Sequence, residues 1–226
     1  MRVAMRNIFK VNALILLALL WAGPVSAEYA DFNGNKVYYR IKGQGEAALV
    51  LIHGWCCDHT VWRYNTPELA KKYKLVLLDM PGHGKSDKPR VAYTFEFLAG
   101  GVAAAIQASG VKNPVLAGHS LGATIGREVI RRNPGKVRGL ISVDGAFDSV
   151  PPEPKARAAW EKLRADRLAG FKRDFRGAMK PFVESMLGPA IKPELKRIIL
   201  DQMLSADPHV AISEGRAMNN PRNWRI

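Results

Sequence analysis

A serine in the middle of the chain stands in a setting suited to nucleophilic chemistry. Ser120 lies between two glycines in the stretch GHSLG, residues 118–122, after an apolar run and before a segment of helical character. This is the G-x-S-x-G pattern of a sharp strand-to-helix turn, which leaves a serine hydroxyl exposed. The alternative is an ordinary Gly-Ser turn. A serine hydroxyl is nearly inert at neutral pH unless a base takes its proton, so the pattern also demands a partner histidine.

Two backbone N–H groups could stabilise the negative charge that a serine attack creates on a carbonyl oxygen. The N–H of Leu121 begins the helix expected after Ser120, where the helix dipole favours an anion. The N–H of Trp55 follows His53-Gly54 at the end of another apolar run. We therefore expect Trp55 and Leu121 to form an oxyanion hole.

These residues need a scaffold, and the pattern of apolar runs predicts its strands. A hairpin is expected to turn at Asn33-Gly34. Continuous apolar runs, typical of strands buried on both faces, follow at 48–54, 74–79, 114–120 and 137–145.

Helical segments are predicted between these strands. One is capped by Thr60 and interrupted or restarted at Pro67, one runs from Thr94 to Ser109, and one follows Ser120. Alternation of this kind predicts an α/β fold with a mostly parallel, doubly wound sheet.

Ligands bind at the carboxyl ends of the strands in such a sheet. Four polar positions fall at strand ends here: His53-Gly54, Asp79, Ser120 and Asp144.

The composition changes at both ends of this α/β region. Residues 1–27 have a basic start, a short apolar run and the small-residue ending Val25-Ser26-Ala27, which predicts a signal peptide cleaved before Glu28. A membrane anchor is the alternative, but the apolar run falls short of the roughly 20 residues that a spanning helix needs. We thus expect export to the periplasm or beyond, a core over 28–150 and a helical region over 151–226.

The charge and the cysteines limit the kinds of partner and cofactor that we expect. The formal net charge of +14 comes from scattered Lys and Arg, so we expect no nucleic-acid binding and at most a weak association with anionic surfaces. Cys56 and Cys57 are neighbours and are interpreted as small side chains beside a pocket, with a redox switch as the less favoured reading. No nucleotide fingerprint or metal-ligand cluster is visible, so no cofactor and no metal are expected.

Three motifs in this order and spacing, HGWCCDHTVWR, LLDMPGHGKSDKP and VLAGHSLGA, resemble the α/β-hydrolase fold superfamily in its small-substrate esterase, lactonase and epoxide-hydrolase-like branch. The resemblance covers residues 29–150 strongly and extends weakly to Met218. It implies acyl transfer on a small ester, lactone or amide through Ser120, an oxyanion loop at 53–55 and a helical cap after Val150. A serine at this turn argues against the carboxylate nucleophile of epoxide hydrolases.

The resemblance also implies residues that we do not find. In the family, an acid and then a histidine follow Ser120 after two further strands, and those strands are missing from this sequence. Some family members place the acid where Asp144 stands, although a structural carboxylate is the favoured interpretation of Asp144. We expect an incomplete hydrolase, with the strand at 137–143 left as an exposed edge that invites self-association.

No histidine is a convincing base. His209 has the setting of a surface residue at a helix start, and His119 adjoins Ser120 at a turn where neighbouring side chains diverge. By the resemblance, His53 braces its turn and His83 shapes its loop, while no pattern supports His59 as the base. The function predicted is a serine hydrolase, and the alternative is an inactive remnant or a binding protein.

Overall fold

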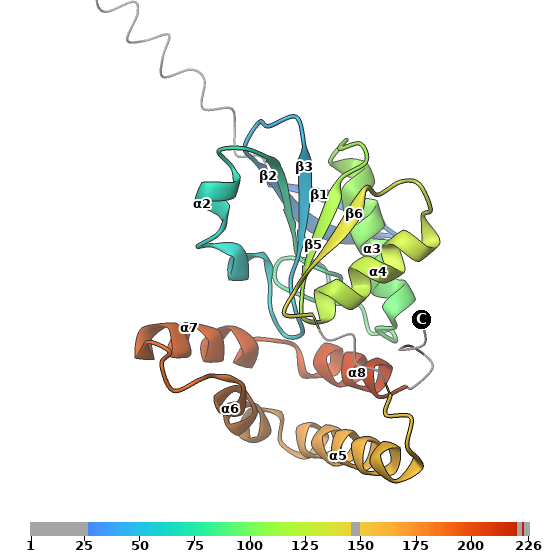
Figure 1. Ribbon diagram of the computed structural model, residues 1–226, viewed down its shortest axis with the longest axis vertical. Coiled ribbons are helices and arrows are strands. Elements are labelled where there is room, and N and C mark those ends of the chain that lie inside the picture. Colours follow the sequence, from blue (N-terminus) through green and yellow to red (C-terminus); the bar gives the residue numbers. More distant parts are fainter. Residues whose placement is uncertain (1–26, 146–149, 221–222, 224–226) are drawn as a thin grey trace, which may run out of the picture.

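The computed structural model describes residues 27–145, 150–220 and 223. A mixed sheet forms the centre of the molecule, in the order β1-β2-β4-β3-β5-β6 (Figure 1). Its strands are β1 (Ala27–Phe32), β2 (Asn35–Lys42), β3 (Ala48–Ile52), β4 (Lys74–Leu78), β5 (Val115–His119) and β6 (Gly139–Val143). The pairs β4–β3, β3–β5 and β5–β6 are parallel, which confirms the predicted α/β class.

The predicted hairpin joins β1 and β2. Asn33 and Gly34 both have positive φ, 54° and 76°, as a two-residue hairpin turn of this hand requires. β2 then pairs antiparallel with β4, which ties the hairpin to the parallel strands.

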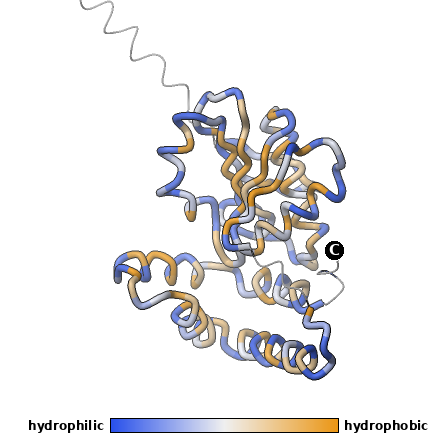
Figure 2. The backbone as a smooth tube through the Cα atoms, viewed as in Figure 1, coloured by the Kyte–Doolittle hydropathy of each residue, from blue (hydrophilic) through white to orange (hydrophobic). Residues whose placement is uncertain are grey.

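The inner strands are apolar along their length (Figure 2), and their side chains pack into clusters on both faces of the sheet. Along β3, Leu49 and Leu51 pack with Trp62 on one face. Val50 and Ile52 point the other way, into the main core. This explains why the runs are continuous rather than alternating.

Two helices cover the main-core face, α3 (Phe95–Ala108) and α4 (Leu121–Arg132). α3 begins where the sequence predicts, because the Thr94 side chain accepts a hydrogen bond from the Phe97 N–H. It ends before Gly110, whose φ is +69°.

The helix predicted from Thr60 is wrong in its cap, whereas the predicted restart at Pro67 agrees with the structure. A 3₁₀ turn, η2 (His59–Trp62), and a one-turn helix, α2 (Thr66–Leu69), take its place. The cap is Asp58, whose side chain accepts from the Thr60 N–H, and the break comes before Pro67, the residue suited to restarting a helix.

β6 forms one edge of the described sheet and is shorter than the predicted 137–145. Ile141 is 49% exposed and Val143 is 38% exposed. Asp144 follows with φ 47°, which turns the backbone out of the strand.

Four helices form a cap below the carboxyl ends of the parallel strands (Figure 1). They are α5 (Pro154–Arg173), α6 (Phe175–Met186), α7 (Pro193–Leu204) and α8 (Pro208–Asn219). Polar contacts join α8 to the core: the Trp55 indole donates to the Ala211 carbonyl, and the Tyr93 N–H donates to Ser213.

The described residues contain no helix long and apolar enough to span a bilayer. The predicted signal peptide over residues 1–27 lies outside them except for Ala27, the first residue of β1.

Candidate functional site

Ser120 occupies the sharp turn between β5 and α4. Its φ of 51° and ψ of −120° are unfavourable for a residue with a side chain. Its N–H donates to the Val143 carbonyl over 3.1 Å, which fixes the turn to the end of β6. A strained serine between strand and helix is the geometry that the sequence pattern predicts.

The neighbouring glycines allow this turn to pack against β3. A Cβ on Gly122 would lie 2.5 Å from the His53 carbonyl oxygen, and a Cβ on Gly54 would lie 2.9 Å from Nδ1 of His119. Real Cβ atoms do not approach so closely. The two glycines therefore let the loop after β3 lie directly against the Ser120 turn.

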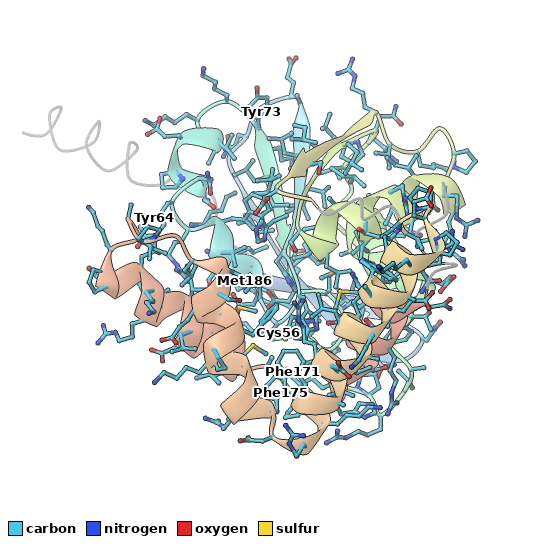
Figure 3. The ribbon with its side chains drawn as sticks, turned by 60° about the horizontal axis from the view of Figure 1, so that its bottom comes forward. Cys56, Tyr64, Tyr73, Phe171, Phe175 and Met186 are labelled. Atoms are coloured by element: carbon cyan, nitrogen blue, oxygen red, sulfur yellow. The ribbon has the colours of Figure 1, made fainter. Side chains whose placement is uncertain are left out.

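A cavity of about 570 Å³ lies between this turn and the cap, and Ser120 lines it. Its walls are mainly apolar, with aromatic side chains from the core (Trp55, Trp62) and from the cap (Phe171, Phe182). Figure 3 shows Phe171 and Phe175 directed from the cap toward Cys56. Such a cavity suits a small, largely apolar ligand.

Both predicted oxyanion donors flank Ser120. Leu121 is the first residue of α4, and Trp55 follows Gly54 in the loop that packs on the turn. Within the described residues, neither backbone N–H donates to a turn, loop or cap hydrogen bond. They are thus available to an oxygen bound at the helix start.

His53 holds the loop after β3 by two hydrogen bonds. Its Nδ1 lies 2.8 Å from the Gly54 carbonyl oxygen, and its Nε2 accepts from the Met80 N–H over 2.9 Å. These partners require a neutral ring protonated on Nδ1. Burial, helped by the nearby His83, lowers the pKa of His53 to about 4.

Asp79 organises the loop after β4. One carboxylate oxygen accepts from the N–H and the Nδ1 of His59, at 2.7 and 2.8 Å, and the other accepts from the Lys85 N–H. Burial opposes ionisation, but the hydrogen bond from His59, the nearby charges of His53 and His59 and the Lys85 N–H together outweigh it and lower the pKa of Asp79. Together with His59 and Asp79, Asp58 forms a group with the spacing of metal ligands. One carboxylate oxygen of Asp58 accepts hydrogen bonds from the Thr60 N–H and the Gln202 side chain.

All five histidines are described, and no hydrogen bond joins any of them to Ser120 within the described residues. His119 lines the cavity, but its Nδ1 is buried without a partner. Burial lowers the pKa of His119, although Asp144 acts in the opposite direction. His209 lies at the start of α8 and contacts the Val91 carbonyl over 3.1 Å.

His83 makes a contact that sequence reasoning missed. Its Nε2 lies 3.3 Å from a carboxylate oxygen of Glu214 on α8, and both side chains are buried. The interpretation of His83 as a loop-shaping residue left out this link to the cap. Nothing in the local sequence signals it, because the two residues are 131 positions apart.

Asp144 and the two cysteines also border the cavity or lie beside it. The Asp144 carboxylate lines the cavity from the end of β6 and accepts no hydrogen bond within the described residues. Residues 146–149, which follow it closely along the chain, are not described. Cys56 and Cys57 are free thiols. Burial raises the pKa of Cys57 to about 12, so this thiol is protonated at neutral pH.

Comparisons with known proteins agree with this geometry. The sequence model of the α/β hydrolase fold matches residues 47–197, about two thirds of the chain. The chain is 34% identical over 152 residues to a pimeloyl-[acyl-carrier protein] methyl ester esterase of Sodalis glossinidius, covering 67% of this chain and 55% of that protein. It is 27% identical to the AB hydrolase superfamily protein YisY of Bacillus subtilis, of which it covers 65%.

Solved structures show the same fold. An esterase from Exiguobacterium antarcticum aligns with a TM-score of 0.76 at 22% identity, covering 87% of this chain and 75% of that one. The esterase RhEst1 from Rhodococcus aligns with a TM-score of 0.68 at 28% identity, covering 82% and 71%. The chain spans just over half to two thirds of the length of the two curated relatives given above. From the matched sequence, the sheet order and the serine turn together, the chain belongs to the α/β hydrolase fold family.

Proposed function

We propose that the chain carries the nucleophile and oxyanion hole of a serine hydrolase that acts on a small ester, lactone or amide. The observation that carries the proposal is the strained Ser120, which lines a closed-over apolar cavity beside the N–H groups of Trp55 and Leu121. The esterase relative and the esterase structures support an ester-like substrate.

In the proposed reaction, Ser120 Oγ bonds to the carbonyl carbon and loses its proton to a base. The carbonyl oxygen takes the negative charge between the two N–H groups, and the bond to the leaving group breaks as that group gains a proton. Water then releases the acid and restores the serine.

A second candidate is a binding protein that keeps the cavity without turnover. The absence of a hydrogen bond between Ser120 and any histidine of the described residues favours it. Without a base, catalysis falls by roughly 10⁴ or more, leaving what the oxyanion hole alone supplies.

Covalent labelling separates the two candidates. A fluorophosphonate probe should label the folded chain, and Ser120→Ala should abolish the label, if a base activates the serine. A folded chain that stays unlabelled would instead establish the binding protein. Ser142→Ala is a matched control, because Ser142 lies on β6 and does not line the cavity.

We also propose that the chain is exported after cleavage before Glu28. The proposal rests on the basic, apolar and small-residue order of residues 1–27. N-terminal sequencing of the protein from a periplasmic or culture fraction should begin at Glu28, and an intact Met1 would contradict it.

A further inference from the structure

One wall of the cavity carries two arginines, Arg164 and Arg167. We propose that they bind an anionic oxyacid group, a carboxylate or a phosphate, at the end of the substrate remote from its ester. The position of the ester at Ser120 rests on the proposed function, whereas binding measurements alone can test the anion site.

The two arginines share a face of α5 with apolar residues. Arg164, Arg167, Leu168 and Phe171 all line the cavity, and their spacing of three, four and seven residues places them on one side of the helix. At the C-terminal end of this face, the Phe171 ring lies 5.2 Å from the ring of Trp55, the residue whose N–H is a proposed oxyanion donor. Arg167 and Arg164 lie about 6 and 10 Å further along the axis, from the rise of about 1.5 Å per residue.

Arg164 is held in place by the cap. Its Nε donates to Asn219 Oδ1 over 3.2 Å and its Nη2 donates to the Met218 carbonyl over 2.9 Å. Its guanidinium also lies 4.5 Å from the centre of the Trp160 ring. A side chain already ordered in this way loses less conformational entropy when it binds a ligand.

Arg167 lies over an aromatic wall of the same cavity. Its guanidinium is 5.0 Å from the centre of the Phe182 ring. Among the described residues, no ion pair neutralises it. A guanidinium can therefore offer paired N–H donors to an incoming carboxylate or phosphate.

The charge balance of the cavity favours an anion. Among the residues that the structure describes, its charged lining consists of three arginines, Arg63, Arg164 and Arg167, and one acid, Asp144. Asp144 follows β6, whose end bonds to the Ser120 turn, so the acid belongs to the reaction-centre side. A cleft with apolar walls and excess positive charge concentrates anionic ligands.

These features specify a chain-like ligand. Its ester would lie at Ser120, its apolar middle against Phe171 and its anionic end at Arg164 and Arg167. A monoester of a medium-length dicarboxylic acid, or its phosphate-ended equivalent, has this layout.

Isothermal titration calorimetry on the full chain carrying Ser120→Ala tests the site without requiring turnover. The ligands are monomethyl suberate, methyl 8-phosphooctanoate and the neutral dimethyl suberate. At low salt, an anionic ligand should bind about tenfold more tightly than the neutral diester, the gain expected of a charge-assisted hydrogen bond. The tighter of the two anions identifies the oxyacid.

Charge-removing variants localise the effect. Arg167→Gln and Arg164→Gln should each reduce the preference for the anion several-fold. Arg173→Gln removes the same charge from the same helix outside the cavity and should leave the preference intact. Because Arg164 also supports the cap, thermal unfolding accompanies each titration, and Arg167→Gln alone decides the result if Arg164→Gln is unfolded.

The proposal is overturned if the neutral diester binds as tightly as both anions, if no ligand binds, or if Arg173→Gln removes the preference equally. An unlabelled Ser120 with an intact anion preference would count against the hydrolase alone. A labelled Ser120 without the preference would count against the anion site alone.

Discussion

Ser120 keeps an unfavourable φ because the backbone around it is tightly packed. The bond from its N–H to Val143 and the close approach of Gly122 to the loop after β3 leave the turn little freedom. Strain of this kind costs of order 1–3 kcal/mol and persists only when surrounding contacts determine it.

Gly122→Ala should therefore destabilise the protein by about 3 kcal/mol or more, because its Cβ would meet backbone atoms that cannot rotate away. Gly139→Ala is the control, since a Cβ at Gly139 meets nothing within 4 Å and its φ is not positive. Urea unfolding measures both free energies. Equal stability of the two variants would show that the turn relaxes freely.

Two buried histidines give stability opposite dependences on pH. The pKa of His53 is lowered by burial to about 4, so stability falls as pH drops from about 6.5 toward 4. Burial also acts to lower the pKa of His83, but the charge of Glu214, supported by Asp79, more than offsets it and raises that pKa. The contribution of His83 is thus complete below about pH 6.5 and is lost as pH rises through its raised pKa.

The Glu214→Gln variant should lose this second dependence. Its unfolding free energy should no longer decline as pH rises above about 6.5, because His83 then lacks the carboxylate that favours its charged form. Glu184→Gln, which removes a partly exposed acid from the cap, should keep the decline. Urea titrations across this range test the pair, and an unchanged slope in Glu214→Gln would contradict the assignment.

At the scale of the elements, β6 combines an apolar composition with side chains that are partly exposed to solvent. Three of its side chains, Leu140, Ile141 and Val143, are apolar, yet Ile141 and Val143 are exposed and one long edge of the strand has no partner in the described sheet. An unpaired, apolar edge promotes pairing with another chain. We therefore propose that β6 drives self-association.

Ile141→Lys should reduce self-association without a large loss of stability, because the exposed side chain contributes little packing and lysine opposes edge pairing. Sedimentation velocity across a concentration series measures the effect. Val91→Lys, at a comparably exposed position outside the sheet, is the control. If Ile141→Lys and Val91→Lys reduce self-association equally, the effect comes from the added charge and not from the strand edge.

The strands and long helices could be predicted because their signals are local. Thr94 caps α3 by a side-chain bond within one turn, and the buried strands are continuous apolar runs. The segment after Asp58 could not be predicted correctly, since its 3₁₀ turn depends on Asp79 and Gln202, which are distant in sequence.

At the scale of the whole molecule, an aromatic cluster contributes to the packing of the cap on the core. Phe171 is buried among Trp55, Phe175 and Phe182. Phe171→Ala should cost about 3–5 kcal/mol and weaken the binding of apolar ligands. Leu163→Ala on the same helix, where the side chain is 59% exposed, should cost less than about 1 kcal/mol. Thermal unfolding checks both, and similar values would contradict this packing.

Some residues of the candidate site could be predicted from the sequence, and others could not. Ser120, Trp55 and Leu121 belong to motifs whose residues are adjacent along the chain. The cavity arginines and Glu214 lie on amphipathic cap helices, where many basic and acidic residues look alike until packing selects the few that face inward.

The attachment of α6 has a consequence for ligand size. α7 and α8 are hydrogen-bonded to the core, and α5 is bonded to α8. Within the described residues, α6 contacts the core through apolar packing, such as the ring contact of Phe182 with Trp55 and the cluster that Met179 and Val183 share with Cys56. Apolar groups can slide without breaking a directional bond to the core, so we expect a bulkier guest to be accommodated by a lateral shift of this one helix that leaves the Ser120 turn unchanged.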